Sequence, residues 1–423
     1  MQIIDDFVPF LSRSPTSFHA AKEISNRLSA ANFTLLEEKE SWHLEEGKGY
    51  FVFRGGALIA FRMPNKFPEK ALLTACHTDS PALKLKPKPE LESKGILQLS
   101  TEIYGAPILH SWLDRDLYLA GQVAFLANQS HIQTKLVQLD QFPLSIPSIA
   151  YHLDRTVAEK GFHIQRQEHL KAIFSTTPSS PSLENLLLNH LDASQILGFD
   201  LFLAPLEKPS FLGASGELLS SYRLDNLSSA HSSLHALLNT NASPHTIQMA
   251  IFWDHEEIGS ATYAGAESDF ALQILERISL HCKIEREDFM RLKARSLCLS
   301  LDVTHAFHPN FPEKYDPQNT PYLGKGVAFK FNASQKYSSS SSTTAPLIHL
   351  CNFHKIPHQL YAARSDIQTG STVGSLMAAN LGIQTLDLGV PIWSMHSIRE
   401  TLALEDQKSL YNLLRAAFQH LVF

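Results

Sequence analysis

Apolar residues along the chain fall into short continuous runs that alternate with longer stretches of mixed character. Runs of this length, bounded by polar or turn residues, are typical of strands that are buried on both faces. The longer stretches place apolar residues at helical spacing along one face. The predicted strands are 71–76, 249–253, 296–301 and 385–390, and the predicted helices are 15–30, 227–238, 345–354 and 404–421. This alternation predicts an α/β fold, with a largely parallel sheet between helical layers in a three-layer α/β/α domain.

Charged and imidazole side chains follow the predicted strands at their carboxyl ends. These candidates are His77 and Asp79 after the first run, Glu256 and Glu257 after the second, Asp302 after the third, His396 shortly after the fourth, and Asp225 at the start of a helix. Ligand sites in parallel sheets lie beyond the carboxyl ends of the strands, so these side chains are expected in one site. Adjacent carboxylates repel each other and need solvent, a shared proton or a cation.

The residue types in this group match the needs of a two-metal hydrolase. Such an enzyme uses imidazole and oxygen ligands, one carboxylate shared by both ions, and another that activates water. Glu256, next to a candidate ligand, is the natural water-activating base. Asp79 lies two residues beyond His77, on the same face of an extended strand, and can orient its imidazole. The candidate metal ligands are His77, Asp225, Glu257, Asp302 and His396.

The middle of the chain has a different pattern. After the segment 84–89, strand-like stretches such as 134–139 follow with few candidate catalytic groups, and a Pro/Ser-rich loop is predicted at 176–182. The α/β pattern resumes near residue 220. We therefore predict a mainly β domain at 91–214, inserted into a discontinuous catalytic domain formed by residues 1–90 and 215–423.

Composition is that of an ordinary globular protein. The chain has 423 residues, of which 44% are hydrophobic and 18% charged, and this length favours two domains. A formal net charge of -6 gives no general attraction to nucleic acid. No apolar run is long enough to cross a bilayer, which predicts no membrane partner. The start lacks the basic segment of a secretory signal and the four cysteines show no paired spacing, so we expect a cytoplasmic protein.

Five motifs together resemble the aspartyl aminopeptidase family, in the same order along the chain. They are His77-Thr78-Asp79-Ser80-Pro81, Leu224-Asp225-Asn226-Leu227, Asp254-His255-Glu256-Glu257-Ile258-Gly259-Ser260, Asp302 with His305-Ala306-Phe307-His308-Pro309-Asn310, and Ser394-Met395-His396-Ser397-Ile398-Arg399-Glu400. The resemblance extends from the N-terminal helix to the C-terminal helix and is weaker in the proposed insertion. One departure lies at Ile367-Gln368-Thr369-Gly370, where many relatives carry Pro-Cys-Gly.

The resemblance implies a zinc-dependent exopeptidase that removes N-terminal residues, preferentially Asp or Glu, from peptides. It implies two Zn²⁺ ions per subunit, with other divalent metals as alternatives. One ion would be held by His77, Asp225 and Asp302, and the other by Asp225, Glu257 and His396. Asp225 would then bridge the ions, with Glu256 as general base.

The resemblance also implies assembly and substrate contacts. The inserted region would be a dimerisation domain, and the family usually forms a large homo-oligomer, often a dodecamer. His152 matches a histidine that the inserted domain lends to the active site of a neighbouring subunit. Lys330 matches a position near the acidic side chain of the substrate.

Two other functions are compatible with these residues. A deacylase or carboxypeptidase with the same two-metal site would differ in its pocket rather than in its ligands. A non-catalytic oligomeric binding protein of the same fold is expected to have lost Glu256 or a ligand, and all are present. The helical pair His231 and His235 is interpreted as packing or surface histidines, and Gly324-Lys325-Gly326 is too short for a phosphate loop.

Overall fold

The computed structural model describes residues 2–127, 131–177 and 180–423, so the loop predicted at 176–182 lies partly outside the described residues. The chain divides into two compact units. The first unit comprises Met1–Asp79, Pro209–Met395 and Glu400–Phe423. The second unit comprises Ser80–Lys208 and His396–Arg399.

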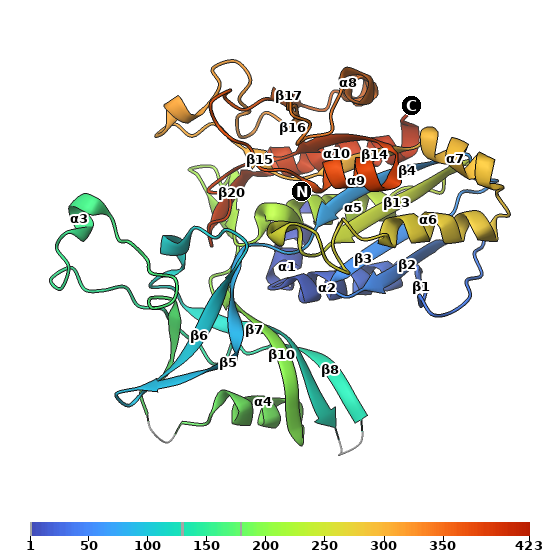
Figure 1. The fold of residues 1–423 in the computed structure, drawn as a ribbon. Coiled ribbons are helices and arrows are strands. Elements are labelled where there is room, and N and C mark those ends of the chain that lie inside the picture. Colours follow the sequence, from blue (N-terminus) through green and yellow to red (C-terminus); the bar gives the residue numbers. More distant parts are fainter. Residues whose placement is uncertain (1, 128–130, 178–179) are drawn as a thin grey trace. The chain divides into compact units, whose positions relative to one another are not determined.

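A nine-stranded sheet forms the centre of the first unit (Figure 1). In spatial order the strands are β1 (Thr34–Leu35), β2 (Gly49–Arg54), β3 (Ala57–Arg62), β13 (Thr246–Trp253), β4 (Lys70–His77), β14 (Leu297–Leu301), β18 (Gln384–Gly389), β16 (Val327–Lys330) and β17 (His358–Tyr361). The four central strands β13, β4, β14 and β18 are parallel, as the apolar runs predict. Antiparallel pairs join β3 to β13 and β16 to β18, so the sheet is mixed toward its edges.

Helices cover both faces of this sheet, which confirms the three-layer arrangement. Alternate strand residues point to opposite faces, so Leu72 and Cys76 of β4 belong to one apolar core, and Leu73 and Ala75 belong to the other. The first core contains side chains from α1 (Gln2–Ser12), α2 (Ser17–Ala30), α5 (Leu224–Leu238), α8 (Ser341–His354) and α10 (Leu404–His420). The second contains side chains from α6 (Phe270–His281), α7 (Arg286–Ala294) and α9 (Val373–Leu381).

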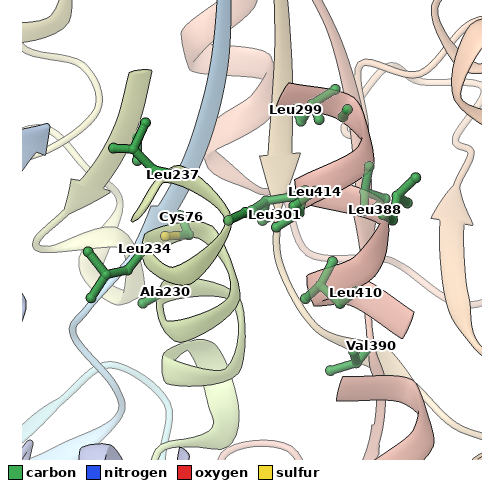
Figure 2. Packing of buried hydrophobic residues seen from close by; sticks show 14 of the residues in the cluster. Cys76, Ala230, Leu234, Leu237, Leu299, Leu301, Leu388, Val390, Leu410 and Leu414 are labelled. Atoms are coloured by element: carbon green, nitrogen blue, oxygen red, sulfur yellow. The ribbon is translucent and has the colours of Figure 1, made fainter. Parts of the chain in front are cut away.

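The first core joins α5 and α10 to the central strands. Figure 2 shows Leu234 of α5 near Cys76 of β4, and Leu414 of α10 with Leu388 of β18 in the same cluster. All four side chains are fully buried. The helix that carries Asp225 is therefore held on the sheet by apolar packing.

A second, five-stranded sheet completes the first unit. Its strands, in spatial order, are β11 (Ser210–Leu212), β12 (Leu218–Ser221), β20 (Glu400–Ala403), β19 (Pro391–Trp393) and β15 (Thr304–His305). Ser221 at the end of β12 is paired with Glu400 at the start of β20. This pairing places Glu400 beside the segment that enters α5.

The second unit is built on one antiparallel sheet. In spatial order its strands are β8 (His131–Gln138), β7 (Leu117–Ala127), β10 (Gln195–Pro205), β5 (Ala82–Ser93), β6 (Ile96–Tyr104) and β9 (Lys171–Ser175), with helices α3 (Val157–Lys160) and α4 (Leu183–Leu191). The boundary predicted at residue 91 falls inside β5. Pro87 and Pro89 suggest a break in the sequence, but they lie at an irregularity in the pairing of β5, between Leu85 and Glu90. Proline is tolerated at such bulges.

Within the described parts of the chain, no helix combines the length and the apolarity that crossing a membrane requires.

The glycine-rich segment Gly324-Lys325-Gly326 binds an anion of the protein itself. The backbone N–H groups of Gly324 and Gly326 donate to the two carboxylate oxygens of Asp406 at 2.7 and 2.6 Å. Asp406 lies in the first turn of α10 and is fully buried. Burial raises the pKa of Asp406 to about 7, against the lowering effect of the two N–H donors.

At about pH 4, we expect Asp406→Ala to lower the free energy of unfolding by about 1–3 kcal/mol, because two buried N–H groups lose their acceptor. The pKa of Asp406 is higher in the folded than in the unfolded chain, so its ionisation opposes folding. The stability of the wild type relative to Asp406→Ala should therefore fall as pH rises from about 4 to about 7, by at most about 1.4 kcal/mol per pH unit. Urea unfolding of both proteins across this range tests it. A pH-independent difference would contradict the raised pKa.

Candidate active site

Strand register places His77 next to the acidic loop. His77 ends β4 and is paired with Trp253, the last residue of the neighbouring parallel strand β13. The backbone N–H of Thr78 also donates to the carbonyl of Trp253 at 2.8 Å. The two strands thus end at paired residues, so the segments that follow them begin side by side.

The segment after β13 turns sharply. His255 has a left-handed backbone with φ 63, and Gly259 has φ 97, a conformation that favours glycine. Between them, Glu256–Ile258 form one 3₁₀ turn, η2. The Asp254 carboxylate accepts the N–H of His255 at 2.9 Å, and the Nδ1 of His255 lies 2.8 Å from the hydroxyl of Thr262. These contacts fix the turn that presents Glu256 and Glu257.

Asp79 joins the acidic turn to His77. Its two carboxylate oxygens accept the backbone N–H groups of Glu256 and Glu257 at 3.1 and 3.0 Å. The Nδ1 of His77 lies 3.1 Å from the carbonyl oxygen of Asp79 and 3.4 Å from its Oδ1. With Nδ1 engaged on this side, the neutral imidazole presents the lone pair of Nε2 on the other.

Three carboxylates approach the Nε2 of His77. The Oδ1 of Asp225 lies 3.4 Å away, the Oδ1 of Asp302 lies 3.6 Å away, and the Oε2 of Glu256 lies 3.9 Å away. Ligand atoms of His77, Asp225 and Asp302 all lie within 4.8 Å of one another, and the same holds for His77, Glu256 and Glu257.

Close backbone packing holds Asp302 in place. Asp302 follows β14, and its N–H donates to the carbonyl of Leu388 in β18 at 3.0 Å. A Cβ atom on Gly389 would lie 1.9 Å from the carbonyl oxygen of Asp302. A larger residue at position 389 would therefore displace the strand end that carries Asp302.

The buried charges shift the pKa values of the group. Burial lowers the pKa of His77, but hydrogen bonding to Asp225, Asp302 and Asp79 outweighs burial and raises the pKa well above its usual value. Burial and the neighbouring carboxylates raise the pKa of Glu256 to about 7, against the lowering effect of His77. A carboxylate that exchanges a proton near neutral pH suits general acid–base chemistry.

Lys330 contacts the acidic group from β16. Its side chain is only 2% exposed, and its Nζ lies 3.1 Å from the Oδ2 of Asp302. The ammonium also lies 5.2 Å from the ring centre of Tyr337. Lys330 thus neutralises part of the charge around Asp302, while the other oxygen of Asp302 faces His77.

Two candidates from the sequence belong to the second unit. His396 has φ 70, and its Nδ1 lies 3.0 Å from the carbonyl oxygen of Ala106. His152 is exposed in a turn, with Tyr151 packed edge-on against its ring. Their roles at the active site stay predictions.

A separate group contains the helical pair His231 and His235. The Oδ2 of Asp6 lies 2.9 and 2.7 Å from their Nε2 atoms, and Arg27 also hydrogen-bonds to this oxygen. His231 is fully buried and packs on Phe7. These short contacts are hydrogen bonds that fasten α1 to α5, in agreement with the interpretation of the pair as packed histidines.

The group around His77 matches the geometry of a zinc site better than the group around Asp6 does. Ligands bonded to zinc at about 2.0–2.2 Å in a tetrahedron lie about 3.3–3.6 Å apart. The separations of 3.4 and 3.6 Å from Nε2 of His77 match that spacing, whereas those around Asp6 are too short. Imidazole and carboxylate are also the donor types that zinc takes. An α/β fold with such a group beyond its parallel strands defines a metal-dependent hydrolase.

Comparison with known proteins identifies the family. The model of the family described as aminopeptidase I zinc metalloprotease (M18) matches residues 10–418. A probable M18 family aminopeptidase 2 from Stutzerimonas stutzeri is 38% identical over 422 residues, covering 97% of this chain and 96% of that protein. One from Clostridium novyi is 37% identical, covering 98% and 99%. The chain belongs to the M18 family and is a metallo-aminopeptidase of its zinc-dependent class.

Solved structures share the fold. A chain in a cryo-EM structure of the Ape4 and Nbr1 complex is 33% identical, with a TM-score of 0.93, covering 99% of this chain and 85% of that chain. An M18 aminopeptidase from Thermotoga maritima is 25% identical, with a TM-score of 0.87, covering 99% and 96%. The expected α/β fold is thereby confirmed.

We expect Asp79→Ala to weaken zinc binding by about 10- to 100-fold, because the variant loses the carboxylate that anchors the turn at Glu256 and lies 3.4 Å from Nδ1 of His77, although the backbone carbonyl contact to Nδ1 is kept. Equilibrium dialysis followed by metal analysis measures the affinity. Asp288→Ala, at an exposed acid paired with Arg291, is the control and should bind zinc as the wild type does. Unchanged affinity in Asp79→Ala would refute this role.

Proposed function

We propose that the protein releases N-terminal residues, preferentially Asp or Glu, from peptides by water activation at two zinc ions. The observation that carries the proposal is the position of Glu256. Its carboxylate has a pKa raised to about 7 and lies 3.9 Å from His77, beside Asp225 and Asp302. A proton acceptor is thus next to a group of zinc-binding type.

The proposed zinc ligands form two sets, each made of imidazole and carboxylate donors. His77, Asp225 and Asp302 hold one ion, and their mutual distances support this. Asp225, Glu257 and His396 hold the other, so Asp225 is shared. The contact between Nδ1 of His396 and the carbonyl of Ala106 supports Nε2 as the ligand nitrogen, since donation from Nδ1 leaves the lone pair on Nε2.

Glu256 moves the proton during hydrolysis. It accepts a proton from the attacking water, whose oxygen bonds to the scissile carbonyl carbon. It then returns the proton to the leaving amine as the peptide bond breaks. The bound zinc ions supply Lewis-acid polarisation and a lowered pKa for water.

The acidic preference rests on Lys330 and on the resemblance to aspartyl aminopeptidases. Lys330 supplies a positive charge beside Asp302. We propose that this charge attracts the acidic side chain of the substrate. We propose that His152 reaches into the active site of a neighbouring subunit, because its side chain is exposed.

The second unit is proposed to mediate a homo-oligomer, up to a dodecamer, in the cytoplasm. Its edge strand β8 is exposed along most of its length, and Ile132 on it is 71% exposed. Leu153, next to His152, is 78% exposed. Apolar side chains exposed on a strand edge or on a loop are typical of surfaces that bind another chain.

Hydrolysis of a panel of aminoacyl substrates by the zinc-loaded protein tests the proposed function. Substrates with N-terminal Asp and Glu should be cleaved fastest, and removal of zinc by a chelator should abolish turnover. Matched substrates with an acetylated N-terminus are the control for exopeptidase action and should stay intact. Faster cleavage of neutral residues would overturn the acidic preference, and cleavage of acetylated substrates would overturn the aminopeptidase assignment.

We expect Glu256→Gln to lower kcat by about 10²–10⁴-fold with zinc retained, because the amide cannot take the proton from water. Steady-state kinetics and metal analysis of the same sample measure both properties. Glu285→Gln, at an exposed glutamate, is the matched control and should keep full activity. Undiminished turnover in Glu256→Gln would refute its role as general base.

A further inference from the structure

The backbone N–H of Asp225 is held by a buried carboxylate from another part of the chain. The Oε2 of Glu400, the first residue of β20, accepts this N–H at 2.9 Å. Glu400 is 2% exposed and Asp225 is 3% exposed, so the bond is shielded from water. A charge-assisted bond of this kind is stronger than one between neutral groups.

The backbone around Asp225 cannot supply this restraint itself. Arg223 is left-handed with φ 64, and Asp225 and Asn226 have non-helical angles at the start of α5. An N–H group at the start of a helix has no acceptor in the preceding turn and needs another partner. Glu400 is that partner, and the bond fixes the peptide plane from which the Asp225 side chain projects.

Residues close to Asp225 in the sequence hydrogen-bond to the segments that carry His77 and Asp302. The guanidinium of Arg223 donates to the carbonyl of Thr78, the residue after His77. The side-chain amide of Asn226 donates to the carbonyl of Leu301, the residue before Asp302, at 2.7 Å. These bonds set the spacing of the three segments, while the bond from Glu400 acts at Asp225 itself.

We propose that Glu400 is a positioning residue that orients Asp225 for zinc binding through its backbone N–H. This inference rests on the proposed function, in which Asp225 is the ligand shared by both ions. Loss of Glu400 lets the Asp225 peptide rotate, so both zinc sites lose one correctly placed oxygen. Glu400 thus acts on metal affinity without touching substrate.

Asp406 provides a matched control for this role. It too is a buried carboxylate of the first unit that accepts backbone N–H groups, here from Gly324 and Gly326. Its loss removes a comparable interaction away from the proposed ligands. Comparing Glu400→Ala with Asp406→Ala separates an effect on zinc from an effect on folding.

The experiment measures zinc affinity of the full-length wild type and of Glu400→Ala, Glu400→Gln and Asp406→Ala by competition with a chelator. Urea unfolding and steady-state kinetics are measured on the same samples. We expect Glu400→Ala to bind zinc about 10- to 100-fold more weakly and to regain kcat in excess zinc. Glu400→Gln keeps an acceptor oxygen and should lose less affinity. Asp406→Ala should lose stability but bind zinc as the wild type does.

Zinc affinity of the wild-type level in Glu400→Ala would overturn the inference, as would an equal loss in Asp406→Ala. Equal losses in Glu400→Gln and Glu400→Ala would also overturn it, because the acceptor oxygen would then be irrelevant. Failure of the wild type itself to bind zinc would refute the proposed function instead, so the two failures are distinguishable.

Discussion

The structure depends on one electrostatic constraint, which is the gathering of several carboxylates around a single buried imidazole. Asp225, Asp302 and Glu256 approach the same nitrogen of His77 within 3.9 Å. Like charges at this spacing are unstable in a buried setting unless a cation or shared protons offset them. Lys330 offsets part of the charge at Asp302. A divalent ion bound at the same oxygens would offset far more, so we regard the group as shaped for a metal.

The fold holds these charges by strand pairing, apolar packing and buried hydrogen bonds. The parallel pairing of β4 with β14 brings His77 and Asp302, which stand at the ends of these strands, near each other. Apolar packing of α5 and α10 holds the helix that carries Asp225. Hydrogen bonds to backbone groups then set the fine positions. Asp79 fixes the turn at Glu256, and Glu400 fixes the peptide of Asp225. Stability and metal binding are therefore coupled through a few buried polar contacts.

Much of this arrangement can be predicted from sequence, because apolar runs mark buried strands and polar residues at their ends mark the site. The residues at 77, 79, 225, 256 and 302 follow from that pattern, and the order of the motifs points to the family. The antiparallel edges of the main sheet do not follow, because β3 and β16 have the same apolar character as parallel strands. The roles of Glu400 and Asn226 do not follow from the sequence, because these side chains bind backbone N–H and carbonyl groups, which every residue type offers. The sequence pattern changes after the prolines of β5, which predicts a boundary at residue 91, whereas the second compact unit starts at Ser80.

The central claim is that the oxygens of Asp225 and Asp302 and the Nε2 of His77 share one zinc ion. Anomalous diffraction at the zinc absorption edge, from crystals of the zinc-loaded protein, tests it most directly. The account predicts an anomalous peak about 2.0–2.2 Å from one atom of each of these residues. A fully zinc-loaded crystal with no peak at His77, or with its strongest peak beside Asp6, His231 and His235, would contradict it.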